Sequence, residues 1–372
     1  YDDLSEEEQI KINKKIDSIN IKLNSELDGL KEGSRLFNLS HSCIYGTDAN
    51  PRMARTSKMN MIMHGDGHGG VHHHDGLLNV NGIFDNRFDV ILTNPPFGSR
   101  INKELKITEN DRFTNESAIK KYLALYGDAY KEALKQVDDH IDTPILDLFE
   151  VGKYSGLTEV LFIDRCINLL KKGGRLGIVL PEGVLNNGNL KKVRDYFEGR
   201  AKIVMICSIP QDVFIASGAT VKPSLVFMKK FTEEEEEQYR DAYEKALNEC
   251  NKKYAKELET LETQKHFAKT AKNKELVKEI SSQIKTIQDK IQVDAQQLRK
   301  TYFDYDVIVA KVNKAGITTT GGKCENELID VLNEFSSYAK ENNIWSYKTP
   351  SFEYKFEEEM VTKYINNTKV NI

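Results

Sequence analysis

The stretch DVILTNPPFG, residues 89–98, places an amide, two prolines and an aromatic ring directly after apolar residues. The two prolines remove two backbone N–H donors, so the expected buried strand ends where they begin. In a doubly wound sheet, ligands bind at the carboxyl ends of the strands. There Asn94 offers a side-chain carbonyl, Pro95 a backbone carbonyl and Phe97 a flat face, and the ring of Pro96 stiffens the loop. These groups suit a planar ring that carries an exocyclic amine.

The chemistry that fits this arrangement is transfer of a methyl group to the amine. Two carbonyl acceptors take both amine hydrogens and bias the nitrogen toward sp³, so that its lone pair can attack an electrophilic methyl group. Stacking of the ring on an aromatic side chain contributes roughly 1–3 kcal/mol per base. A base inside a duplex must be flipped out to reach such a pocket. We therefore predict Asn94, Pro95, Pro96 and Phe97 as the catalytic residues.

The elements that must position this motif alternate between strand and helix. A helix is expected over about residues 5–36, and a polar stretch at residues 99–155 has the length of a partly helical functional insertion. Other strands are expected at residues 43–48, 88–94, 175–181, 202–210 and 222–230, with helices at residues 50–65, 156–174 and 189–199. This alternation predicts an α/β fold with a mostly parallel sheet and helices on both of its faces.

The character of the sequence changes at Thr232, where two highly charged helices begin. The second carries isoleucines at spacings of four, three and four, which predicts a coiled-coil seam: Ile280, Ile284, Ile287 and Ile291. We place a turn at residues 263–272 and expect an antiparallel helical hairpin. The hairpin is either a solvated spacer or a docking arm for another subunit or DNA. A strand followed by a glycine turn is expected at residues 305–322, and a last amphipathic helix is expected at residues 325–345.

The charge and the cysteines narrow the function classes. The chain of 372 residues has no apolar run long enough to span a membrane, and its five scattered cysteines suit a reducing, cytoplasmic location. The net charge is −4, whereas a protein that binds nucleic acid tightly on its own usually shows a basic excess. A local basic run is either a set of phosphate contacts or a solvated helix face: Lys191, Lys192, Arg194, Arg200 and Lys202.

Several segments together resemble one family. The Asn94 motif resembles that of amino-group methyltransferases that use S-adenosylmethionine (SAM). Residues 44–78, IYGTDANPRMARTSKMNMIMHGDGHGGVHHHDGLL, resemble the methylation (M) subunits of type I restriction–modification systems. The stretches GGRLGIVLPEGVLNN, SGATVKPSLVFMKK and, loosely, YDVIVAKVNKAGITTTGG are similar to later strands of that family.

The resemblance implies roles for particular residues. Asp48 would hold the ribose hydroxyls of SAM, and Asp75, followed by Gly76, would read the amino group of its adenine. Asn94 would also border the cofactor. Residues that would hold the flipped base are Phe97, Phe214 and Lys222.

The resemblance also implies a domain plan and a function. A Rossmann-like SAM-dependent methyltransferase domain would occupy residues 1–231, followed by the hairpin at 232–300 and a small α+β region at 301–372. The protein would methylate N6 of adenine in double-stranded DNA together with a DNA-specificity subunit and a restriction nuclease subunit. Two alternatives stay open: an amino-group methyltransferase acting on cytosine N4, an rRNA base or a protein glutamine, and a non-catalytic scaffold.

The sequence departs from this family at one place. It contains no loop of the type Asp-Pro-x-x-Gly-x-Gly, which in the family precedes the first helix and cradles SAM. We expect this loop and the first strand to lie upstream of Tyr1, so that the chain is a C-terminal portion of an M subunit.

Three other features of the sequence are candidate sites. Histidines cluster between residues 64 and 74, but the glycines among them break any helix, and we predict no metal site: His64, His68, His72, His73 and His74. Cys207 lies inside an apolar strand and is expected to be a buried core thiol. Glu182, at a strand end, either contacts the substrate or serves the turn.

Overall fold

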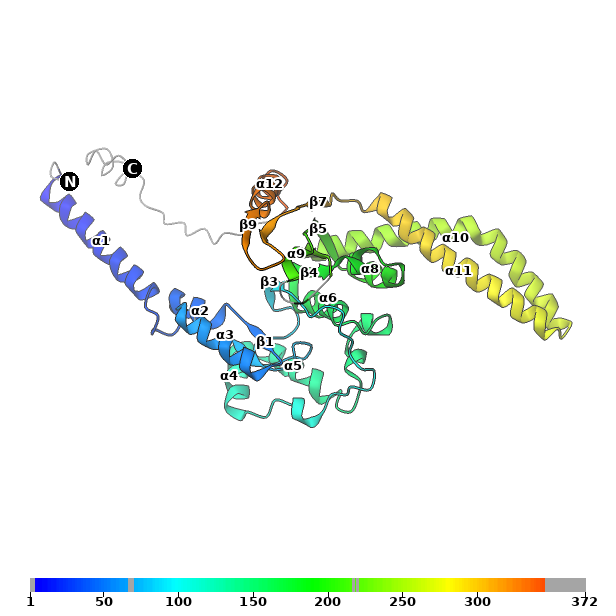
Figure 1. Cartoon of the computed structure of the whole chain (residues 1–372), viewed down its shortest axis with the longest axis horizontal. Coiled ribbons are helices and arrows are strands. Elements are labelled where there is room, and N and C mark those ends of the chain that lie inside the picture. Colours follow the sequence, from blue (N-terminus) through cyan, green and yellow to red (C-terminus); the bar gives the residue numbers. More distant parts are fainter. Residues whose placement is uncertain (1–3, 66–69, 216–217, 219–220, 345–372) are drawn as a thin grey trace. The chain divides into compact units, whose positions relative to one another are not determined.

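The computed structural model describes residues 4–65, 70–215, 218 and 221–344. Contacts between residues divide the chain into two units, whose helices and strands are labelled in Figure 1. The first unit comprises Tyr1–Ile83, Phe113–Val137 and Ser336–Ile372, and the second comprises Phe84–Arg112 and Asp138–Phe335. Each unit is described by itself.

The first unit contains two short parallel strands, β1 (Gly46–Asp48) and β2 (Val71–His73). Its helices are α1 (Glu6–Glu26), α2 (Arg35–Ser42), α3 (Pro51–Met63), α4 (Glu116–Tyr126) and α5 (Asp128–Asp138). The strand predicted at residues 43–48 and the helix after it are therefore present, and so is helical structure in the insertion.

The single helix expected over about residues 5–36 is wrong, because α1 and α2 are separate helices. Gly33 adopts a positive φ of 86°, a conformation that a continuous right-handed helix does not permit. The Ser34 side chain then accepts a hydrogen bond from the Phe37 amide and begins α2 as its N-cap.

The second unit is built on a five-stranded sheet of order β3-β4-β6-β5-β7. Its strands are β3 (Phe88–Thr93), β4 (Leu170–Pro181), β5 (Ala201–Ser208), β6 (Pro223–Lys230) and β7 (Ile308–Lys311). The fold is α/β, as predicted, but the sheet is mixed, since β6 runs antiparallel to both β4 and β5. Parallel neighbours are usually joined by a crossover helix, whereas the described part of the β5–β6 connection holds one short helix, Asp212–Ile215.

Strand β3 differs from the prediction that it is buried. It pairs with β4 on one side and forms an edge of this sheet. Val90 is 45% exposed and Leu92 77% exposed. An apolar run is compatible with either a central or an edge strand, because strand neighbours are decided by tertiary pairing.

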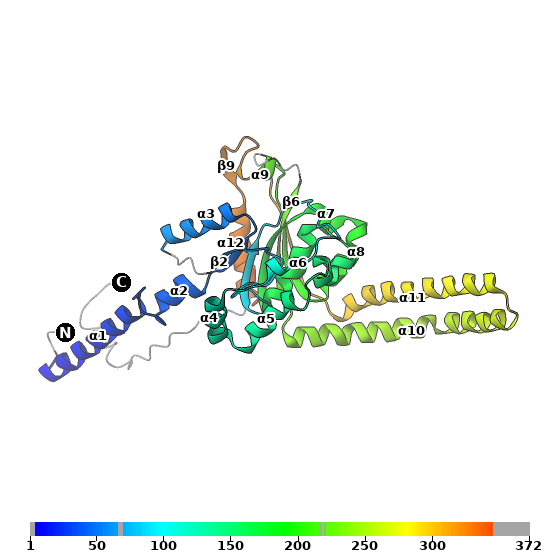
Figure 2. The ribbon, with the colours of Figure 1, turned by 90° about the horizontal axis from the view of Figure 1, so that it is seen from below.

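Helices α6 (Thr158–Leu169), α7 (Glu182–Asn186), α8 (Lys191–Glu198) and α9 (Asp212–Ile215) connect the strands of this sheet. Helix α6 contacts β4 and α8, and α8 contacts β5 (Figure 2). Most of α6 is buried, including Val160, Leu161 and Ile163. The predicted helix at residues 156–174 ends earlier, because β4 already begins at Leu170. Three short 3₁₀ turns, Glu109–Asp111, Ile145–Leu148 and Glu150–Lys153, lie in the insertion.

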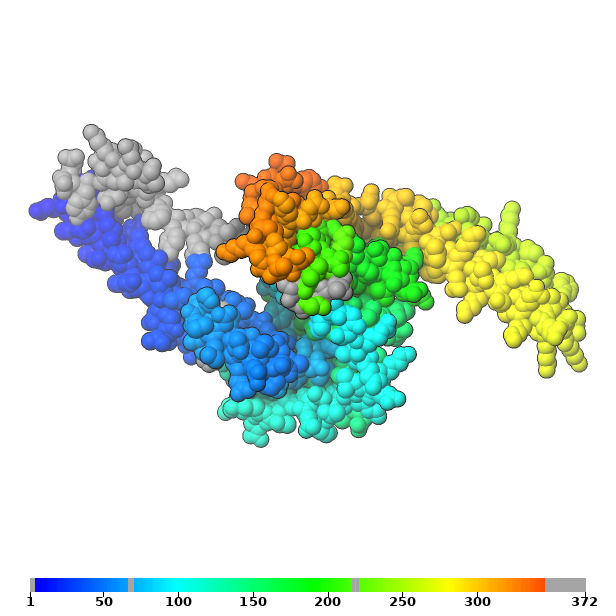
Figure 3. Space-filling model, in the orientation of Figure 1, coloured from blue at the N-terminus to red at the C-terminus, as the bar shows by residue number. Residues whose placement is uncertain are grey.

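The predicted hairpin is formed by α10 (Glu233–Thr270) and α11 (Lys274–Tyr302), which lie side by side (Figures 1 and 3). A capping box on Thr232 starts α10. Helix α10 continues through most of the range where the turn was expected, and the reversal follows at residues 271–273, where Lys272 has a φ of 55°. The predicted seam is buried along the hairpin: Ile280, Ile284, Ile287 and Ile291.

After β7, two antiparallel strands, β8 (Ala315–Ile317) and β9 (Lys323–Asn326), precede α12 (Leu328–Glu341). The predicted division into three domains stays a prediction. Among the described residues, no helix is long and apolar enough to cross a membrane.

Candidate functional site

Strand direction gathers the predicted catalytic motif and several polar residues at one edge of the five-stranded sheet. Strands β3, β4, β5 and β7 point the same way, and β6 points the opposite way. The carboxyl ends of four strands and the amino end of β6 therefore share an edge. Asn94 follows β3, Glu182 follows β4, Ser208 ends β5 and Lys222 precedes β6. This carboxyl edge of the sheet is where α/β proteins bind ligands.

The motif itself lies in a loop with alternating burial. Asn94 and Pro96 are exposed, Pro95 is buried, and Phe97 is half-buried. The ring of Phe97 meets the ring of Phe214 edge to face, with centroids 5.5 Å apart and an interplanar angle of 75°. The structure thus brings together the two aromatic residues predicted to hold a base. An edge-to-face contact covers at most one face of one ring, so this contact leaves an aromatic face for stacking.

Glu159, which sequence reasoning missed, anchors the loop after the motif. Its side chain is part of α6, is only 3% exposed, and accepts the Gly98 amide at 3.2 and 3.3 Å. Next to it, the Thr158 amide and hydroxyl both donate to the Ser99 carbonyl, at 2.9 and 3.1 Å. The start of α6 therefore fixes the backbone that follows Phe97. The available signal was an acid in the first turn of a largely apolar helix.

Glu182 and Lys222 form an ion pair at the carboxyl edge, with Lys222 Nζ 2.7 Å from Glu182 Oε1. The Ser208 hydroxyl donates to the same oxygen at 3.3 Å. The hydrogen bond from Lys222 is the main reason that the pKa of Glu182 lies below its usual value. Lys222, predicted to touch the base, is therefore held by Glu182, and Glu182 also begins α7.

In the first unit, the two predicted cofactor acids lie at the carboxyl ends of the paired strands. Asp48 ends β1 opposite His73, and Asp75 stands two residues beyond the end of β2, followed by Gly76. Each half-buried carboxylate accepts a backbone amide through Oδ1: Asp48 from Asn50 at 2.7 Å, and Asp75 from Leu77 at 2.9 Å. These bonds point the carboxylates in fixed directions, which suits the binding of hydroxyl or amino hydrogens.

His72 lies between these acids in sequence but is held as a neutral ring. Burial, and to a lesser extent the charges of Lys58 and His74, lower its pKa to about 4. The Asn81 amide donates to His72 Nδ1 at 3.1 Å, so the ring proton sits on Nε2. His68 lies outside the described residues, and the described part of the chain has no cluster of side chains that could hold a metal.

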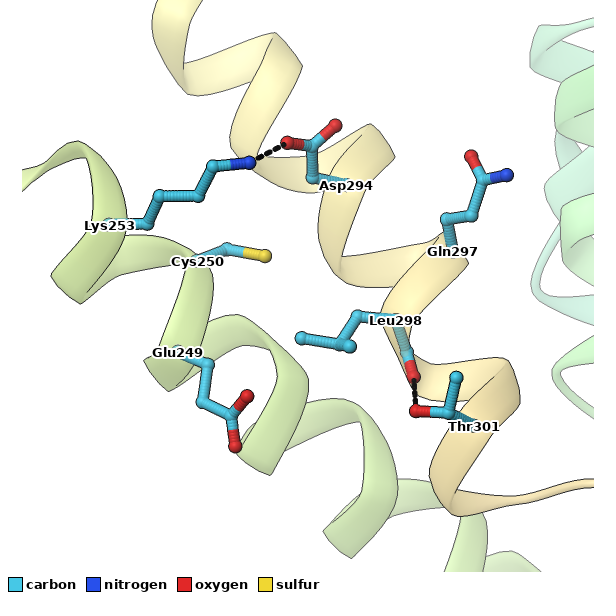
Figure 4. A pocket seen from close by; sticks show the side chains of 7 residues that line it. All are labelled: Glu249, Cys250, Lys253, Asp294, Gln297, Leu298 and Thr301. Atoms are coloured by element: carbon cyan, nitrogen blue, oxygen red, sulfur yellow. Dashed lines mark hydrogen bonds and ion pairs between the residues drawn. The ribbon is translucent and has the colours of Figure 1, made fainter.

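A pocket of about 480 Å³ lies on the hairpin, far along the chain from the motif (Figure 4). It is bordered by Cys250 and Leu298, and Lys253 Nζ lies 3.2 Å from Asp294 Oδ2 at its rim. Burial raises the pKa of the Cys250 thiol, so the thiol stays protonated and is a poor nucleophile. Burial in β5 likewise raises the pKa of Cys207. Neither cysteine offers nucleophilic chemistry.

Comparison with known proteins gives one extensive match. The family model described as N-6 DNA Methylase matches residues 34–127 and 126–303, which together exceed half of the chain. The protein named Defense against restriction protein B of Escherichia phage P1 is 24% identical over 112 residues, which are 30% of this chain and 5% of that protein.

Solved structures share weaker similarity. A modification subunit assigned to a type I restriction enzyme from Vibrio vulnificus gives a TM-score of 0.37 at 21% identity, over 54% of this chain and 35% of that one. The M protein of the type I restriction enzyme EcoKI gives 0.36 at 21%, over 56% and 35%. The chain thus spans about a third of the length of these two proteins. The match to the family model, which covers more than half of the chain, is what assigns the chain to a family.

Proposed function

The chain belongs to the N-6 DNA methylase family, and from this premise we propose that it transfers a methyl group from SAM to the N6 amine of adenine in DNA. We further propose that it acts as the modification subunit of a type I restriction–modification system. The observation that carries the proposal is the Asn94–Phe97 motif at the carboxyl edge, with Phe97 and Phe214 in contact there.

In the proposed reaction, Asn94 and the Pro95 carbonyl each accept one hydrogen of the adenine amine. The amine nitrogen then forms the new bond to the methyl carbon, the bond from that carbon to sulfur breaks with its electron pair left on sulfur, and the nitrogen releases a proton to water. Phe97 stacks on the flipped base, and Phe214 supports the ring of Phe97. The chain contributes positioning and electrostatics, without a covalent enzyme intermediate.

The described residues fit SAM at one end of the cofactor. SAM supplies the activated methyl group, and we propose that Asp48 binds its ribose hydroxyls and that Asp75, with Gly76, binds its adenine. Both carboxylates are half-buried at the ends of paired strands, with Oδ1 of each already oriented by a backbone amide. The proposed partners are double-stranded DNA, a DNA-specificity subunit and a restriction nuclease subunit. The net charge of −4 is consistent with a partner subunit that recognises the DNA sequence and supplies part of the binding to DNA.

The test is analysis of methylated nucleosides by mass spectrometry, with the protein as its gene encodes it, a specificity subunit, SAM and DNA. We expect N6-methyladenine from the wild type and a loss of at least about 10²-fold for Asn94→Ala, since removing one oriented acceptor removes transition-state stabilisation. Calorimetry should show that Asn94→Ala still binds DNA, whereas Asp48→Ala loses SAM.

The matched control is Asn189→Ala, which removes an exposed asparagine from the turn before α8 and should leave methylation unchanged. A methyl group found on cytosine N4, on an rRNA base or on a protein glutamine would contradict adenine N6 as the acceptor and identify that group instead. No methyl transfer and no SAM binding by the wild type would make the chain a scaffold.

A further inference from the structure

Helices α8 and α11 enclose a charged groove of about 290 Å³ within the second unit, here called the α8–α11 groove. The charged residues that line it are Lys191, Arg194, Asp195, Glu198, Arg299 and Lys300. The four from α8 follow the i, i+3, i+4, i+7 spacing, so they occupy one helix face. The groove therefore has four cationic and two anionic side chains along its walls.

The two carboxylates of the groove offset only part of its positive charge. Asp195 Oδ2 lies 2.8 Å from Lys191 Nζ, one turn away on the same helix. Glu198 Oε2 is shared by two cations, at 3.6 Å from Arg299 and 3.5 Å from Lys300. One carboxylate between two cations leaves an excess positive charge at that end of the groove.

Arg194 adds a second uncompensated charge. Its guanidinium donates to the Val184 carbonyl at 3.1 Å and to the Asn187 carbonyl at 2.7 Å. Backbone carbonyls carry no net charge, so these bonds hold the side chain in place without cancelling its positive charge. They also tie α8 to α7, which starts at Glu182 on the carboxyl edge of the sheet. The Arg194 end of the groove thus adjoins the segment that leaves the candidate site.

Arg299 is the buried cation in the wall of the groove. Its side chain is 4% exposed, and its guanidinium lies 4.5 Å from the centre of the Tyr239 ring. Its Nε is buried and has no hydrogen-bond partner among the described residues. A buried donor without an acceptor is costly, and a phosphate oxygen is an acceptor that matches a guanidinium.

The other basic residues singled out in the sequence have partners elsewhere. Lys192 Nζ lies over the Tyr154 ring at 5.5 Å, and Arg200 pairs with Glu150 at 2.7 Å. Lys202 pairs with Glu235 at 2.9 Å. Among the residues of the predicted basic run, only Lys191 and Arg194 line the groove. The other cations that line it come from α11, a helix about a hundred residues later in the sequence.

We propose that the α8–α11 groove binds phosphates of the DNA backbone. The inference rests on the proposed function for the identity of the phosphate source, and it adds a named binding surface to that function. Phosphate contacts position a protein on DNA and make affinity depend on salt. Because the chain is acidic overall, such contacts must be concentrated at a local basic surface.

The test is the salt dependence of DNA binding, measured by fluorescence anisotropy with a labelled duplex and the protein in its complex. The variant is Lys191→Ala/Lys300→Ala, which removes two exposed groove cations and leaves Arg194 and Arg299 in place. The matched control is Lys278→Ala/Lys285→Ala, which removes two exposed lysines of α11 outside the groove. Both variants change the net charge equally.

Each lost phosphate contact lowers the slope of log K against log salt by about 0.9. We expect the groove variant to lose nearly two units of slope, with a raised KM for DNA and an unchanged kcat, and the control to keep the wild-type slope. Equal slopes for the two variants, with wild-type methylation intact, would overturn the groove and leave the proposed function standing. A wild type that binds no DNA would overturn both.

A second arm distinguishes DNA from free phosphate. Calorimetry with inorganic pyrophosphate is run on the same three proteins. Pyrophosphate binding that is lost in the groove variant, together with an unchanged DNA slope, would assign the groove to a small phosphate ligand and overturn the DNA proposal.

Discussion

Glu159, in helix α6, lies 61 residues beyond Gly98 in the chain and contacts the loop that follows the Asn94 motif. Its carboxylate is buried and accepts the Gly98 amide through both oxygens, so the loop after Phe97 has a fixed backbone. The motif supplies the acceptors and the ring, whereas Glu159 and Thr158 determine how the loop that carries them is held. Glu159 is therefore a positioning residue for the proposed reaction.

Replacing Glu159 tests this positioning role. Glu159→Ala leaves the Gly98 amide without its acceptor, which costs about 1–3 kcal/mol locally. Since small displacements of oriented groups have large kinetic effects, we expect kcat for methylation to fall on the order of 10²-fold with an unchanged KM for SAM.

The matched control is Glu159→Gln, whose side-chain carbonyl can still accept the amide and should restore most of the rate. Amide hydrogen exchange at Gly98 gives a readout independent of activity and should accelerate only in the alanine variant. Equal exchange at Gly98 in both variants would remove Glu159 from this role.

At the scale of elements, the hairpin illustrates how a sequence pattern becomes a packed seam. The isoleucines of α11 are buried against α10, where Cys250 and Tyr254 pack in the same cluster as Ile287 and Ile291. Exposed ion pairs on the hairpin, such as that between Lys253 and Asp294, contribute little by comparison. The apolar seam therefore carries most of the stability of the hairpin.

The seam predicts a difference between two neighbouring positions of α11. Ile291 is 3% exposed, and Ile291→Ala should cost about 2–5 kcal/mol, because it removes buried methyl groups and leaves a cavity. Val293 is 49% exposed, and Val293→Ala should change the stability by less than about 0.5 kcal/mol. Hydrogen exchange of the α11 amides measures both variants. Similar exchange in the two would contradict the packing of the seam.

At the scale of the whole molecule, the chain divides into two compact units, and each contains its own buried groups. In the first unit, His72 is neutral because burial lowers its pKa from 6.5 to about 4. The unfolded chain therefore binds more protons than the folded one between these two pH values. His72 therefore does not lower the free energy of unfolding above about pH 6.5. Below that pH, the free energy of unfolding falls by roughly 1.4 kcal/mol for each pH unit, down to about pH 4.

His72→Gln removes this titration and keeps an acceptor for the Asn81 amide. We expect the variant to lose less stability between pH 7 and pH 5 than the wild type, as measured by hydrogen exchange of β1 and β2. The control is His64→Gln, at an exposed histidine of the same unit, which should keep the wild-type pH dependence. A His72→Gln variant that follows the wild-type profile would show that another group is responsible.

Much of the architecture was predictable from the chain alone, because local patterns report local structure. The Asn94 motif, the strand–helix alternation, the α/β class and the buried isoleucine seam follow from residue types and their spacing, and membership in the N-6 DNA methylase family is confirmed. The roles of Asp48, Asp75, Phe97, Phe214 and Lys222 stay predictions that the experiments above address.

Tertiary structure alone decided what depends on distant residues. Pairing with a neighbour on only one side makes β3 an edge strand, and the antiparallel pairing of β6 with β4 and β5 makes the sheet mixed. Long-range folding brings Glu159 to Gly98 and the cations of α8 to those of α11. The periodicity of the sequence predicts on which face of a helix or strand a side chain lies. Which residue that side chain contacts is determined by how the helices and strands pack.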